Sequence, residues 1–173
     1  MTTDRGPDDE PSADGGPDDS SPWAELLADA ESIADEYRAD GWTVERLRTR
    51  DVAPWRTDEE PAGDDAAGGF LTLVGDESFD EIEARVAEGT FASAEVYRRR
   101  VGDAVLAIAV ELDAPTETAV VVPLYYRPEE ARAALDAAGA AGELQVRVRP
   151  EGRDDWLTFV HDDPELFEPD DPR

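Results

Sequence analysis

The chain has 173 residues, of which 44 are Asp or Glu and 16 are Arg, so its formal net charge at pH 7 is −28. It contains no cysteine, which excludes disulfide bonds and thiolate metal sites. Its longest apolar run, 104–110, is far shorter than the roughly 20 residues of a membrane-spanning helix, so we predict a cytoplasmic protein without membrane contact.

The acidic charge is the strongest signal in the composition. Every basic residue is an arginine, and the acids are spread along the whole chain. At about 1 M salt the Debye length is only ~3 Å, so a compact chain with this charge suits a concentrated salt solution. The leading interpretation is a halophilic surface, and the alternative is a specific basic partner or mimicry of nucleic acid. Binding of nucleic acid is disfavoured by the same charge.

Three segments lack apolar periodicity. Residues 1–20 and 169–173 are polar and acidic, which predicts disordered ends. Residues 50–69 are rich in Gly, Pro and acids and are predicted to form a flexible loop. The remaining 21–168 are expected to fold as a single domain.

Three helices are predicted from apolar residues at helical spacing. The first spans 22–41 and is capped by Ser21, with a proline at its first position and a glycine at its end. The second opens at a capping box in 78–81 and closes at Gly89. The third spans 128–139.

The stretch 94–127 organises the predicted fold. Turn signals at Gly102 and Asp103, and again at 113–116, divide it into three antiparallel strands. Further strands are expected at 42–48, 70–74, 144–149 and 156–160. The sequence therefore predicts an α+β fold, with a mostly antiparallel sheet of about five to seven strands and two or three helices packed on one face.

The turn at residue 102 also predicts a strand register. A two-residue turn pairs Arg99 with Leu106 and Tyr97 with Ile108, so that the apolar side chains face the helices. Slipping the register by one residue would put two arginines on the core face, and for this reason we prefer the first register.

A candidate anion site consists of four arginines on predicted strands. Arg98 and Arg100 share one strand face, as do Arg147 and Arg149, because side chains two residues apart lie on the same side. If the strands are neighbours, their guanidinium groups line one surface that suits a carboxylate or phosphate. The alternative, which we favour, is an exposed face where these arginines pair with surplus acids.

Catalytic and metal chemistry has little support. His161, Asp162 and Asp163 could hold a hard cation, but contiguous ligands rarely close a site, and an acidic strand end is the preferred interpretation. With a single histidine and no phosphate-binding glycine motif, neither a catalytic triad nor a cofactor is predicted. Trp42, Trp55 and Trp156 are expected in the core rather than around a pocket.

Four segments carry a resemblance: GWTVERL, AEVYRRRVGDAVLAIAVELD, VPLYYR and WLTFVHDDPELF. They resemble a family of uncharacterised haloarchaeal proteins, over residues 22–167. The resemblance implies a cytoplasmic protein of a salt-loving archaeon, from a domain-of-unknown-function family, with no catalytic residues to carry over.

The leading functional hypothesis is a non-enzymatic binding or interaction module, because no catalytic constellation is recognised. The first alternative is a small-anion binder, or an enzyme, that uses the arginine-lined sheet face. The second is an immunity-type or regulatory partner of a basic protein. The ligand, the partner and the oligomeric state stay open at this point.

Overall fold

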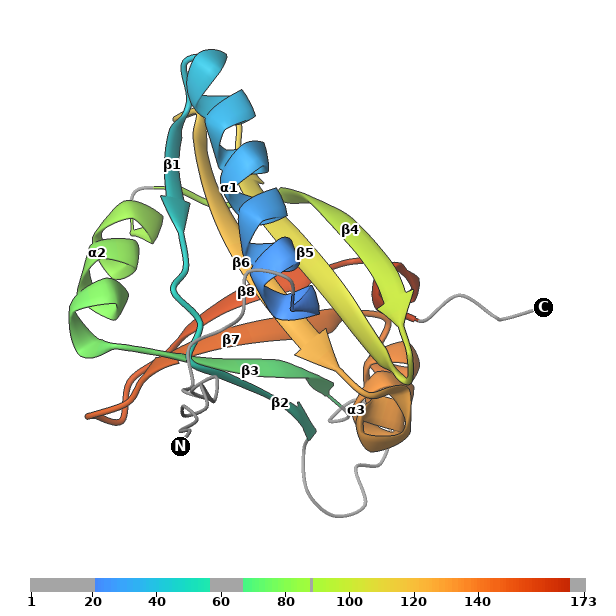
Figure 1. Cartoon of the computed structure of the whole chain (residues 1–173). Helices are drawn as coiled ribbons and strands as arrows, with labels where there is room; N and C mark the ends of the chain where they lie inside the picture. Colours follow the sequence, from blue (N-terminus) through green and yellow to red (C-terminus); the bar gives the residue numbers. More distant parts are fainter. Residues whose placement is uncertain (1–20, 57–66, 88, 169–173) are drawn as a thin grey trace, which may run out of the picture.

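The computed structural model describes residues 21–56, 67–87 and 89–168 (Figure 1). Within this part the chain forms three α-helices and eight strands, arranged as two mixed sheets of four strands each. The α+β class is confirmed, whereas the expectation of one mostly antiparallel sheet is wrong. The predicted disordered ends, 1–20 and 169–173, lie outside the described residues.

The first sheet has the strand order β1-β6-β5-β4. Its strands are β1 (Thr43–Arg46), β4 (Ser93–Val101), β5 (Ala104–Asp113) and β6 (Thr118–Tyr126). The last three run antiparallel along the chain, and β1 joins β6 in parallel. Gly102 makes the β4–β5 turn with a φ of 62°, a conformation that glycine adopts without steric cost.

The predicted register is confirmed. Arg99 pairs with Leu106, and Tyr97 pairs with Ile108. As expected, Leu106 and Ile108 face a helix, because both belong to the core cluster that α1 (Pro22–Ala39) forms on the outer face of the first sheet. The turn and the apolar alternation are local signals, so the sequence specifies this part of the fold.

Helix α1 is bounded as its sequence predicts. The side chain of Ser21 accepts a hydrogen bond of 3.1 Å from the backbone N–H of Ala24. Gly41 follows the helix with a φ of 94°. Trp42 then folds back on the last turn, where its ring lies 5.4 Å from that of Tyr37.

The second sheet has the order β2-β3-β7-β8. Its strands are β2 (Asp51–Arg56), β3 (Gly68–Val74), β7 (Leu144–Pro150) and β8 (Leu157–His161). β3 and β7 are parallel, and the two outer pairs are antiparallel. Both sheets therefore have two free edges among the described residues.

Strand β2 corrects the prediction of a flexible loop over 50–69, and residues 57–66 lie outside the described residues. All six residues of β2 pair with β3, and Val52 is buried. The proline at 54 is tolerated because β2 is an edge strand, where a missing backbone donor leaves no ladder bond unmade. The sequence contains no sign of this strand, because β2 pairs with β3 and the sequence between the two strands shows no apolar periodicity.

Two sheets form, rather than one, because β5 and β6 are buried on both faces. Residues 105–110 are all buried, so each side of β5 must be covered. Helix α1 covers one side and the second sheet covers the other. The helices are consequently not packed on one face: α2 (Asp76–Val86) and α3 (Pro128–Ala141) contribute Phe79 and Leu135 to the core between the sheets and lie on opposite sides of the molecule (Figure 1).

The bounds of α2 and α3 differ from the prediction by one turn or less. α2 begins at Asp76 after Gly75, so the predicted capping box at 78–81 does not start the helix. Acids in the first turn interact favourably with the helix dipole, which supports the earlier start. α3 continues beyond Gly139 and ends at Gly142, which takes the left-handed conformation. No described helix is long and apolar enough to cross a membrane.

Candidate functional site

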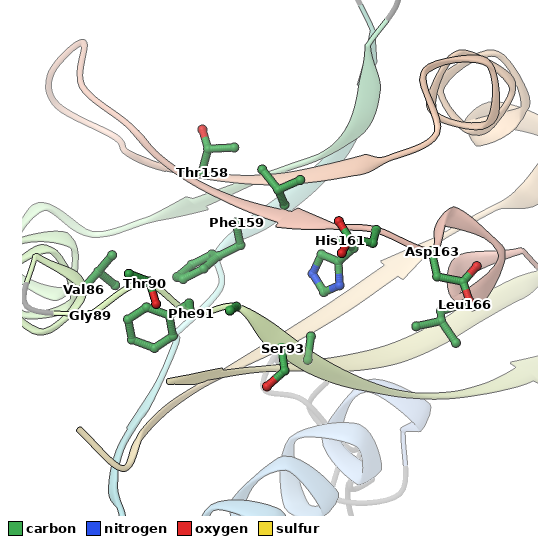
Figure 2. Close-up of a pocket in the computed structure, with 14 residues that line it drawn as sticks. Val86, Gly89, Thr90, Phe91, Ser93, Thr158, Phe159, His161, Asp163 and Leu166 are labelled. Atoms are coloured by element: carbon green, nitrogen blue, oxygen red, sulfur yellow. The ribbon is translucent and has the colours of Figure 1, made fainter. Parts of the chain in front are cut away.

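A groove of about 720 Å³ lies between the two sheets (Figure 2). Its walls are the beginning of β4 with the segment before it, and strand β8. Both are edge strands, and among the described residues neither pairs with another strand on its outer side. An edge strand leaves a row of backbone donors and acceptors free. The groove therefore combines two unpaired strand edges.

The floor of the groove is aromatic. Phe91 precedes β4 and Phe159 lies on β8, and their buried rings meet edge to face with centroids 5.7 Å apart. Phe91 has a φ of 46°, a left-handed conformation that costs a residue with a Cβ roughly 1 kcal/mol. Burial of its ring against Phe159 offsets that cost, so the segment before β4 is held in an unusual conformation at the groove.

The segment before β4 is fixed by Asp113, at the end of β5. The Asp113 carboxylate accepts hydrogen bonds from the backbone N–H and the hydroxyl of Thr90, at 3.3 and 3.4 Å, and from the hydroxyl of Thr116. The hydrogen bond from Thr116 is the main reason that the pKa of Asp113 is lowered. A Cβ at Gly89 would lie 2.5 Å from Oδ2 of Asp113, so a larger residue there would displace the carboxylate that Thr90 and Thr116 bind.

A buried histidine–glutamate pair lies beside the groove. Nε2 of His161, on β8, is 2.7 Å from Oε2 of Glu111, on β5, and both side chains are 1% exposed. Burial raises the pKa of the Glu111 carboxyl, although its hydrogen bond to His161 and the charge of that ring act in the opposite direction. The pair thus ties the edge of the second sheet to the interior of the first.

The other ring nitrogen of His161 has no hydrogen-bond partner among the residues that the structure describes. Nδ1 is buried and makes no hydrogen bond within the described part of the chain. His161 lines the groove, and its ring projects from β8 into the space between the two walls (Figure 2). An unsatisfied buried polar atom costs about 1–3 kcal/mol.

The predicted metal residues are not assembled into a site. His161 points inward, whereas Asp162 and Asp163 are exposed, because β8 ends at His161 and the two acids lie on the chain that leaves the sheet. The Asp163 side chain instead accepts from the backbone N–H of Glu165 and caps a short 3₁₀ helix, Pro164–Phe167. No cluster of three or more potential metal ligands occurs among the described residues.

The four predicted arginines lie on two different sheets. Arg98 and Arg100 are on β4, and Arg147 and Arg149 are on β7. Nη1 of Arg98 donates to the backbone carbonyl of Leu166 at 2.6 Å. The guanidinium groups therefore do not line one surface, because the strands that carry them are not neighbours.

Two of the three tryptophans singled out in the sequence come together. Trp55 and Trp156 flank Arg147 on the second sheet, whereas Trp42 packs beside α1. The sequence interpretation missed Glu111 altogether. A signal was present, since Glu111 interrupts the apolar run of the strand AVLAIAVELD, but the predicted register placed it on the face opposite Leu106 and Ile108.

The chain matches the model of a family of unknown function, DUF7529, over residues 10–169. The chain belongs to the DUF7529 family. No curated protein and no solved structure is matched. The DUF7529 match includes both walls of the groove and both members of the His161–Glu111 pair. Membership of a domain-of-unknown-function family is thereby confirmed, and origin from a salt-loving organism stays a prediction.

Proposed function

We propose that this DUF7529 protein is a non-enzymatic binding module adapted to high salt, and that its groove holds an extended basic segment of a partner protein. The observation that carries the proposal is the presence of two free strand edges, β4 and β8, along one groove. An extended peptide adds to such an edge through main-chain hydrogen bonds, while alternate side chains contact the walls.

The distribution of charge along the two edges supports strand addition. Natural proteins protect free edges with charged side chains. β4 carries the arginines 98–100 in its second half, outside the groove, and has the small residues Ser93 and Ala94 inside it. β8 carries no Asp, Glu, Arg or Lys, and its Val160 is 46% exposed. The edges are thus unprotected where they line the groove.

The walls provide two kinds of side-chain recognition. Phe91 and Phe159 offer an apolar contact at the floor, and the exposed carboxylates of Asp162 and Asp163 offer a polar contact at the rim. Because side chains of a strand alternate, apolar residues at every second position of the peptide would face the floor.

Charge favours a basic partner. The exposed carboxylates of Asp162 and Asp163 lie at the groove, within a protein of net charge −28. In concentrated salt the attraction acts only over about 3 Å, so Arg or Lys of the partner must contact these acids directly. The proposal therefore joins the binding-module hypothesis with that of a regulatory partner of a basic protein.

The hydrogen bonds of the groove support a non-enzymatic role. Nε2 of His161 is engaged by Glu111, and within the described residues no hydrogen bond joins this ring to a hydroxyl group. Thr90, the hydroxyl residue fixed at the groove, is bonded to Asp113. A histidine-activated nucleophile would require that missing contact.

The proposal is tested by selecting a displayed library of random decapeptides on the full chain in 2 M KCl. We expect enrichment of peptides that alternate apolar with polar residues and carry Arg or Lys. Binding should be lost in Ala94→Trp, which fills the groove, and kept in Ala140→Trp, the same change at an exposed site on α3. Circular dichroism establishes that both variants fold.

A second version of the experiment does not depend on a variant chain. Methylating alternate backbone nitrogens of a selected peptide should abolish binding for one set of positions and spare it for the other, because the peptide pairs along only one of its edges, with β8. The proposal is wrong if no peptide is enriched, if Ala94→Trp binds as well as the parent, or if both methylated sets bind equally.

A further inference from the structure

The outer face of the second sheet is not covered by a described helix. α1 packs on the first sheet, while α2 and α3 contribute to the core between the sheets. Side chains of the second sheet alternate between that core and the outer face. Those on the outer face include Trp55, Leu71, Arg147 and Val160, and Leu71 belongs to neither core cluster.

Arg147 lies at the centre of this face, flanked by two indoles. Its Cζ is 3.7 Å from the ring centroid of Trp55 and 4.8 Å from that of Trp156. The ring of Trp55 reaches Arg147 across β3, and the residue of β3 that pairs with Trp55 is Gly69. A Cβ at that glycine would lie 1.8 Å from the backbone oxygen of Gln145, so no side chain can stand there between the indole and the arginine.

The charge of Arg147 has no counter-ion among the described residues. No carboxylate of the described residues makes an ion pair with it, although Arg149, two residues along the same strand, pairs with Asp154 at 3.1 Å. Arg147 is half-buried, and this loss of solvent lowers the pKa of its guanidinium, which still remains charged at neutral pH. A partly desolvated cation without an acid is unexpected in a chain with 44 acidic residues.

The hydrogen bonds of Arg147 leave one edge of the guanidinium available. Nε and Nη2 both donate to Oε1 of Gln145, at 3.3 and 3.2 Å. Nη1 and the second N–H of Nη2 remain, and together they form the fork that binds two oxygens of a carboxylate or phosphate. The indole N–H of Trp55 likewise lacks an acceptor among the described residues.

We propose that Trp55, Arg147 and Trp156 form a binding site for the oxyanion group, carboxylate or phosphate, of a small ligand with a flat apolar body. The oxyanion would take the free fork of Arg147. The apolar body would stack on the indole of Trp156, which is accessible to a ligand because this residue is 52% exposed. The site lies outside the groove. Of the four arginines that the sequence predicted as an anion site, it includes only Arg147.

The test is a titration of tryptophan fluorescence with benzoate and with phenyl phosphate, at constant ionic strength set by KCl. Benzyl alcohol is the uncharged control with the same ring. The proteins are the parent chain, Arg147→Gln and Arg149→Gln, the matched change at the arginine that already has an acid partner.

We expect a saturable signal with at least one anion, weakened about tenfold or more in Arg147→Gln and kept in Arg149→Gln. Trp156→Ala should weaken binding by a similar factor. Because Trp156 is exposed, this variant replaces Arg147→Gln in the test if Arg147→Gln does not fold. The proposal is overturned if neither anion gives a saturable signal or if benzyl alcohol binds as tightly as the anions. It is also overturned if the folded Arg147→Gln or Trp156→Ala binds the anions as tightly as the parent.

Discussion

Nε2 of His161 and Oε2 of Glu111 lie 2.7 Å apart, and they join the edge strand of one sheet to an inner strand of the other. The contact spans 50 residues of sequence and is fully enclosed. Removing one partner of such a pair leaves a buried polar group unsatisfied, so the pair stabilises the contact between the two sheets.

The first prediction concerns the pH dependence of this pair. Because burial raises the pKa of Glu111, the folded chain holds that proton to a higher pH than the unfolded chain. The free energy of unfolding contributed by Glu111 therefore falls as pH rises from its unfolded pKa of about 4.5 through its folded pKa. The stability of the parent minus that of Glu111→Gln should decline over this range, measured by urea denaturation at constant high salt. A difference that stays constant with pH would contradict it.

The second prediction concerns two glycines. A Cβ at Gly69 would lie 1.8 Å from the backbone oxygen of Gln145, so Gly69→Ala must displace β3 from β7 and should destabilise the fold by about 3 kcal/mol or more. Gly139 lies within α3 with no atom within 4 Å of its added Cβ, so Gly139→Ala should stabilise by about 0.5–1 kcal/mol. Chemical denaturation of both variants decides the matter, and equal effects would refute the assigned pairing of β3 with β7.

The third prediction concerns salt. The ion pairs at the surface join exposed side chains, as in Arg127 with Glu130, and such pairs contribute less than about 1 kcal/mol each. The repulsion within a net charge of −28 should therefore dominate at low salt. The melting temperature by circular dichroism should be markedly higher in 2 M than in 0.1 M KCl. Equal melting temperatures would remove the halophilic explanation of the acidity.

Local signals predicted much of the first sheet. Ser21 and Gly41 bound the first helix, and the turn at Gly102 with the alternation of Leu106 and Ile108 gave the correct register. Each of these depends on residues close together in the chain, where turn chemistry and side-chain period act directly.

The division into two sheets was not predictable in the same way. β2 pairs with β3 across a segment without periodicity, and β7 joins β3 in parallel after some 70 intervening residues. Such pairings are decided by burial of the whole domain rather than by local pattern. The arginines of β4 and β7 were grouped on one face for this reason, and the contact of Glu111 with His161 was missed.

Amide hydrogen exchange can show whether the groove takes an extended basic segment along β8. The parent chain is measured with and without a peptide selected as above, in 2 M KCl. The account predicts that alternate amides of residues 158–161 become protected when the peptide binds, since only those N–H groups point away from β7. Binding that leaves the exchange of β8 and of the beginning of β4 unchanged would contradict it.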